Sequence, residues 1–169
     1  EITTFEDIDA AKQAYLDGQC EVITSDHAQL HALRAKLDAP RAHRILPEVI
    51  SKEPLGPAVR KGDPTWFDIV RWTLFVLIDA EEMGIGSTNV AHVREVAESS
   101  DTQLLLDVDG RAAARLGIEP GWSQRIIAQV GNYDEIFQRN LGARSALKIK
   151  RGLNALWREG GLLYAPPAR

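Results

Sequence analysis

The chain has 169 residues, of which 44% are hydrophobic and 26% are charged, and its formal net charge is −4. This length is typical of one globular domain with a sizeable core. The weakly acidic balance excludes the basic surface that binding to nucleic acid or to an anionic membrane requires, and no apolar run reaches the length of about 18 residues needed to span a bilayer.

The first predicted element is a helix that begins at Thr4 as N-cap and ends at Gly18. Asp7 then lies in the first turn, where a negative charge is favourable. The residues of its apolar face recur at helical spacing: Phe5, Ile8, Ala11, Tyr15 and Leu16.

A short apolar strand is predicted at residues 22–24, and it leads to Asp26 at the start of a second helix. The point where a strand feeds a helix N-terminus is where open α/β sheets bind small ligands. Asp26 could cap the helix, with Gln29 at the capping-box position. It could also hold the ammonium group of a ligand, because a carboxylate in a cleft binds a cation strongly, but the spacing alone favours the cap.

A second strand is predicted at residues 44–50, where Pro47 favours an edge position. Residues 51–54 then break the pattern and are predicted to form a loop. Asp63 and Pro64 form a strong helix start, and this helix is predicted to reach Met83, to be closed by Gly84 and to be buried on most sides. Glu81 and Glu82 are interpreted as its solvated end.

The remainder is predicted to be helical, with no strand after Ile85. The expected helices span residues 89–99, 102–116 (interrupted by Gly110), 122–130, 133–141 and 152–159. Such a region should cover a sheet rather than supply one.

Other candidate sites are weak. His27 and His31 share a helix face, but Ala28 replaces the glutamate of a His-Glu-x-x-His zinc motif and no third ligand is evident. No nucleophile elbow is present. Residues 84–87 contain two glycines without the lysine of a phosphate loop. We therefore expect no metal, no cofactor and no catalytic residue.

Several blocks of the chain, taken in order, resemble the general L-amino-acid-binding branch of the periplasmic solute-binding proteins of ABC transporters. The blocks are residues 21–26, 44–63, 66–74, 130–137, 151–157 and 160–167. They cover nearly all of this chain but correspond to about the latter half of the family pattern.

The resemblance implies the C-terminal part of a two-lobed α/β protein of the type II periplasmic-binding-protein fold, with a helix-rich extension. Residues 1–50 would belong to lobe 2, residues 51–54 to the interlobe crossing or hinge, and residues 55–169 to lobe 1 with its helical extension. Asp26 would bind the α-ammonium group of a free L-amino acid, which the receptor would deliver to a membrane permease from the periplasm. The family residues that bind the ligand carboxylate cannot be placed on this sequence.

The resemblance also implies that Cys20, which could pair with a cysteine in the earlier half, is a free thiol here. Helices shaped for a missing sheet would expose apolar faces, so self-association is expected. Two alternatives stay open: an interaction domain in which Asp26 is only a helix cap, which the absence of a strand at residues 22–24 would favour, and a dehydratase-like enzyme on the same bilobal fold.

Overall fold

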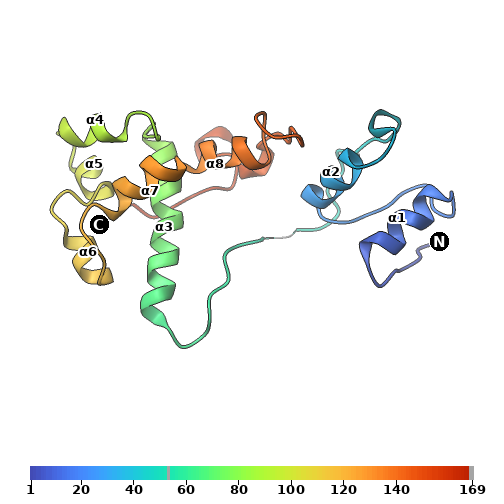
Figure 1. The fold of residues 1–169 in the computed structure, drawn as a ribbon, viewed down its shortest axis with the longest axis horizontal. Coiled ribbons are helices and arrows are strands. Elements are labelled where there is room, and N and C mark those ends of the chain that lie inside the picture. Colours follow the sequence, from blue (N-terminus) through green and yellow to red (C-terminus); the bar gives the residue numbers. More distant parts are fainter. Residues whose placement is uncertain (53, 168–169) are drawn as a thin grey trace. The chain divides into compact units, whose positions relative to one another are not determined.

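A computed structural model describes residues 1–52 and 54–167 of the chain. It separates into two units, Glu1–Pro54 and Leu55–Arg169, each of which is described by itself (Figure 1). The boundary falls at the end of the predicted crossing, residues 51–54, of which residue 53 lies outside the described residues. The role of this stretch as a hinge stays a prediction.

The N-terminal unit contains two short helices, α1 (Ile8–Leu16) and α2 (His27–Ala35), and a 3₁₀ turn, η1 (Pro40–Ala42). The N-cap of α1 is Asp7, not the predicted Thr4, because the Asp7 carboxylate accepts a hydrogen bond of 2.8 Å from the backbone N–H of Ala10. Gly18 follows α1 with a positive φ of 74°, as predicted for the residue that ends it.

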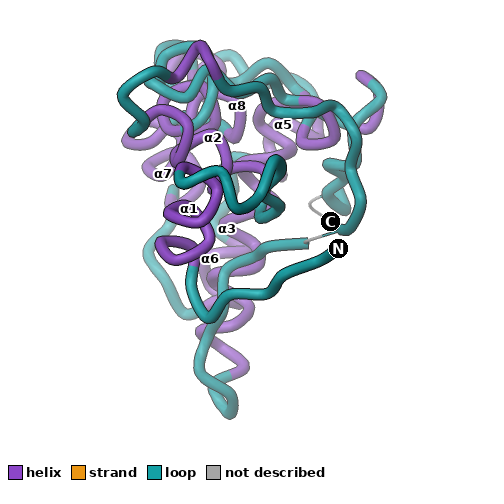
Figure 2. Tube along the Cα trace, turned by 90° about the vertical axis from the view of Figure 1, so that its right-hand side faces the viewer, coloured by secondary structure: helices purple, strands orange, loops and turns teal. Residues whose placement is uncertain are grey.

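Neither predicted strand of this unit is formed. Residues 22–24 and 44–50 are extended or irregular, and Figure 2 shows helices joined by loops throughout the described residues. A strand is defined by hydrogen bonds to a neighbouring strand, and the described part of residues 1–54 supplies no such neighbour. The predicted sheet is therefore not formed by the described residues of this unit, which is the outcome expected of the interaction-domain alternative, although the apolar pattern of these segments remains.

The N-terminal unit has almost no core of its own. Ala14 is its one buried hydrophobic residue among those described, and Tyr15 Oη joins His43 Nδ1 at 2.7 Å to tie α1 to the chain after η1. Large apolar side chains are exposed instead, among them Val22, Leu46, Val49 and Ile50. Exposed apolar side chains in this number favour burial against another surface.

The C-terminal unit is organised around α3 (Pro64–Glu82). As predicted, Asp63 caps it by accepting a hydrogen bond of 2.9 Å from the Trp66 N–H, and Pro64 occupies its first position. The prediction that α3 is buried on most sides holds for its second half, where residues 76–80 are all buried. The first turns extend beyond the other helices of the unit and expose Trp66 and Phe67 (Figure 1).

Five further helices surround the second half of α3: α4 (Val90–Glu95), α5 (Ser100–Leu105), α6 (Arg111–Leu116), α7 (Trp122–Val130) and α8 (Tyr133–Asn140). Helices α5–α8 each contact α3, and α4 packs on α7. Val76 and Ala80 of α3 lie in the main core cluster with Leu105, Leu106 and Ile127. Burial of a leucine or isoleucine side chain stabilises the fold by roughly 1.5–3 kcal/mol, so this cluster holds the unit together.

The last predicted helix, residues 152–159, is wrong. The segment forms two 3₁₀ turns, η2 (Gly152–Asn154) and η3 (Trp157–Glu159), joined by extended residues. Leu156 and Leu163 form an isolated parallel bridge, the one β contact among the described residues. Across the same residues, none of the helices is both long and apolar enough for a bilayer.

Arg151 connects three segments of the C-terminal unit. Its guanidinium donates to Glu81 of α3 at 2.9 and 3.1 Å, to Asp134 of α8 at 2.6 Å and to the Asn154 carbonyl at 2.9 Å. The Arg151 and Glu81 side chains are 14% and 9% exposed. Burial raises the pKa of Glu81 although the bond and charge of Arg151 act to lower it, so desolvation outweighs the pairing.

Removing Arg151 should therefore cost more than removing a surface charge. We expect Arg151→Met to lower the free energy of unfolding by about 3–5 kcal/mol, because Glu81 is left as an unpaired buried charge. Urea denaturation of this chain measures the effect. Arg111→Ala, which breaks the exposed pair with Asp109, is the control and should leave the urea midpoint nearly unchanged. Equal midpoints for both variants would contradict the structural role of Arg151.

Candidate functional site

Asp26 lies where the sequence predicts, at the N-cap position of α2, and it is half-buried. Its carboxylate does not accept a hydrogen bond from the first turn of the helix. The predicted capping box is wrong, because Gln29 hydrogen-bonds the Ser25 hydroxyl instead of the Asp26 backbone. The helix start therefore leaves the Asp26 carboxylate without a capping role.

The surroundings of Asp26 carry two further polar groups. The rings of His27 and His31 lie edge to face with centroids 4.6 Å apart, as expected for side chains four residues apart on a helix. Within the described residues, no group of three or more histidine, cysteine or acidic side chains is placed to hold a metal ion. Cys20 is a half-buried free thiol.

The loop between α3 and α4, which contains the glycines compared above with a phosphate loop, is held by Glu135 of α8. The Glu135 carboxylate accepts from the Ser87 N–H at 2.9 Å, from the Ser87 hydroxyl at 2.5 Å and from the Asn132 N–H at 2.9 Å. Burial acts to raise the pKa of Glu135, but these hydrogen bonds lower it overall. A Cβ at Gly86 or Gly131 would lie 2.7 Å from a Glu135 carboxylate oxygen, so a side chain at either position would require this carboxylate to move.

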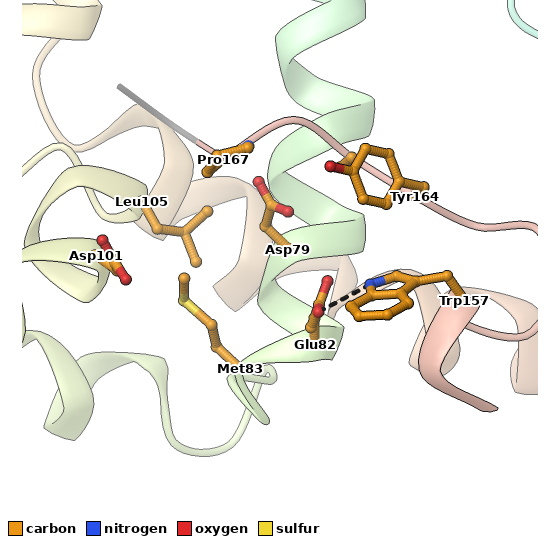
Figure 3. Close-up of a pocket in the computed structure, with 9 residues that line it drawn as sticks. Asp79, Glu82, Met83, Asp101, Leu105, Trp157, Tyr164 and Pro167 are labelled. Atoms are coloured by element: carbon orange, nitrogen blue, oxygen red, sulfur yellow. Dashed lines mark hydrogen bonds between the residues drawn. The ribbon is translucent and has the colours of Figure 1, made fainter.

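A cavity of about 350 Å³ lies in the C-terminal unit beside the last turns of α3 (Figure 3). Three acidic residues line it, Asp79 and Glu82 of α3 and Asp101 of α5, and no basic residue lines it among those that the structure describes. Trp157 and Tyr164 lie at its other side, with ring centroids 6.3 Å apart. The remaining lining residues are apolar: Met83, Leu105, Ala165 and Pro167.

Asp79 is an unusual lining residue of this cavity, because it is an acidic residue that is largely buried. Its side chain faces the space between Leu105, Tyr164 and Pro167 in Figure 3, and the residue is 7% exposed. No described residue donates a hydrogen bond to its carboxylate. Burial, assisted by the negative charge of Glu82, raises the pKa of Asp79 from 3.8 to about 6.

The sequence did not reveal this cavity. Glu81 and Glu82 were interpreted as a solvated helix end, but Glu81 is buried against Arg151, and Glu82 accepts a hydrogen bond of 3.1 Å from the Trp157 indole. Helical periodicity places Asp79 among the buried residues of α3, which is the one signal that could have found it. Of the two aromatic residues, Trp157 comes from a segment predicted to be a helix and Tyr164 from the tail after it, so their position could not be foreseen.

The raised pKa of Asp79 makes a prediction about stability. The folded state holds a proton on Asp79 more tightly than the unfolded state, so its contribution is most favourable below pH 3.8 and is lost as the pH rises to about 6. Asp79→Asn removes this loss, and we expect it to stabilise the chain at about pH 7.5 by roughly 2 kcal/mol, with little gain at about pH 4. Thermal denaturation of both proteins across this range is the measurement, and a gain that does not depend on pH would contradict the assignment.

The chain is similar to known proteins over nearly all of its length. The protein YhdW of Escherichia coli K12, named as a binding protein of an amino-acid ABC transporter, is 52% identical over 166 residues. The general L-amino acid-binding periplasmic protein AapJ of Rhizobium johnstonii is 50% identical over 167 residues. The glutamate/glutamine/aspartate/asparagine-binding protein BztA of Rhodobacter capsulatus is 42% identical over 158 residues. No family model matches the chain.

A solved structure agrees with these relatives. It is an ABC transporter periplasmic binding protein from Brucella ovis with glutathione bound, which is 47% identical and superimposes with a TM-score of 0.89.

These matches cover 94–98% of this chain, but the chain spans about half the length of each relative, 47–49% of the curated proteins and 52% of the solved chain. That share fits the C-terminal portion expected from the sequence. The chain therefore belongs to the family of periplasmic binding proteins of amino-acid ABC transporters, and its matched region is about half of such a protein.

Proposed function

We propose that this chain forms part of a receptor that binds a free L-amino acid in the periplasm and delivers it to an ABC transporter permease. The observation that carries the proposal is the half-buried Asp26 at the start of α2, whose carboxylate accepts no capping hydrogen bond. A carboxylate of this kind is available for an ammonium group, and its charge-assisted hydrogen bonds are among the stronger ones in proteins. The matched relatives, which are named as amino-acid-binding proteins, support the choice of ligand.

In this proposal Asp26 binds the α-ammonium group, and the other half of the receptor supplies the groups for the α-carboxylate. The ligand then bridges two lobes, and residues 51–54 act as the hinge that closes them. Closure follows if the ligand contacts both lobes in the closed state and one lobe in the open state, since only such differential contact shifts the equilibrium. No chemical conversion of the ligand is part of this function.

The Brucella ovis structure favours a second ligand for the same site. Glutathione, which that structure contains, ends in a γ-glutamyl group with a free α-ammonium and a free α-carboxylate. Asp26 could bind this ammonium group in the same way as that of an amino acid. The two ligands differ in the rest of the molecule, so the titration below includes both.

The role of Asp26 is tested in a chimera in which this chain replaces the matching half of the Rhizobium johnstonii relative. Calorimetric titration with L-amino acids, and separately with glutathione, should show binding by the chimera. Asp26→Asn should weaken it by about 2–5 kcal/mol, the usual cost of removing one partner of a buried charge pair.

Asp38→Asn is the matched control, because Asp38 is an exposed carboxylate of the same unit. This variant should leave the affinity unchanged. Binding that survives Asp26→Asn would refute the role of Asp26 while leaving the family intact. No heat from any L-amino acid or glutathione in a folded chimera would favour the interaction-domain alternative.

Self-association of this chain is also part of the proposal. An apolar groove of about 230 Å³ follows the exposed half of α3 and is lined by Pro57, Val59, Phe67, Val70, Arg71, Leu74 and Phe75. An exposed apolar surface of this kind promotes association. We expect the apparent mass in light scattering to rise with concentration and Phe67→Asp to reduce that rise. A monomer at every concentration would contradict this.

A further inference from the structure

The cavity beside Asp79 contains a buried acidic group without a partner. Asp79 is more than nine-tenths buried, its carboxylate faces the cavity, and no described residue donates a hydrogen bond to it. The Asp79 oxygens are not among the fully buried unpartnered atoms, so they keep contact with solvent through the cavity, where a ligand could replace that solvent. In folded proteins, a buried polar group without a hydrogen-bond partner usually indicates a missing partner or a functional role.

The electrostatics of the cavity favour a positive partner. Glu82 and Asp101 add two carboxylates to that of Asp79, and within residues 1–52 and 54–167 no basic residue lines the cavity. The cavity also lies at the C-terminal end of α3, a helix of 19 residues. The helix dipole places partial negative charge at this end, which stabilises cations there.

The shape and the apolar lining favour an organic cation over a metal ion. The described carboxylates do not gather into a group that could hold a metal. Trp157 and Tyr164 bring two aromatic rings to the same cavity as the acids, and aromatic rings attract organic cations through their π faces. The volume, about 350 Å³, lies within the range of roughly 300–1,000 Å³ that is typical of small-molecule pockets.

We propose that this cavity binds a small organic cation with a primary ammonium or guanidinium group, placed against the Asp79 carboxylate with its apolar part against Leu105 and the Trp157–Tyr164 pair. Glu82 is already engaged by the Trp157 indole, so it holds the aromatic ring in place and adds charge. All of these residues belong to the C-terminal unit, whereas Asp26 belongs to the N-terminal one. The inference therefore stands or falls independently of the amino-acid site.

The test uses this chain and two probes of nearly the same shape, n-butylguanidinium and the neutral N-butylurea. The readout is the NMR resonance of the Trp157 indole N–H, which Trp157→Phe identifies by its disappearance. We expect n-butylguanidinium to shift this resonance in a saturable way and N-butylurea to bind at least about tenfold more weakly, since the charge-assisted contact is lost. n-Butylammonium should behave like the guanidinium probe.

Asp79→Asn should weaken binding of both cations by at least about tenfold. This variant is expected to be more stable than the original protein at neutral pH, so loss of binding would not reflect unfolding. Glu95→Gln removes one exposed negative charge of the same unit outside the cavity and should leave binding unchanged.

Three results would overturn the proposal. The first is equal binding of n-butylguanidinium and N-butylurea, which would reveal an apolar groove only. The second is an equal loss in Glu95→Gln and Asp79→Asn, which would reveal attraction by net charge. The third is a Trp157 indole resonance that neither cation shifts at any concentration below that at which nonspecific contact alone would shift it.

Discussion

Burial of the second half of α3 is the constraint on which the C-terminal unit depends. Residues 76–80 are enclosed by helices α5–α8, and Arg151 fastens the C-terminal segment to the same end of α3 through Glu81. As a consequence, several acidic side chains at the C-terminal end of α3 are partly or largely shielded from solvent. One of them, Glu81, is paired, whereas Asp79 faces a cavity, and this difference gives the two residues separate roles.

The N-terminal unit, in contrast, has almost no buried core. Among its described residues it presents extended apolar segments and one small buried hydrophobic side chain, Ala14. A strand cannot be assigned where no neighbour completes its hydrogen bonds. The chain spans about half the length of the amino-acid-binding proteins it matches, and Asp26 lies at a helix start with no strand formed beside it among the described residues.

The sequence predicted the helices that depend on local signals and missed the features that depend on distant partners. Asp63 and Pro64 begin α3 as predicted, and α7 spans the predicted residues 122–130. The strands at residues 22–24 and 44–50 are wrong because their pattern requires a sheet. Gln29 also left the expected capping box for Ser25. The position of Asp26 was predictable from its block of sequence, whereas the Asp79 cavity required tertiary packing.

The central claim is that this chain supplies one side of an L-amino-acid site that the other half of the receptor completes. The most direct measurement is calorimetry on this chain, on the complementary half of the Rhizobium johnstonii relative, and on the two combined, each titrated with L-amino acids. The account predicts that the combined halves bind and that each half alone binds far more weakly. Binding by this chain alone with the affinity of the combined halves would contradict it, because the chain would then contain a complete site.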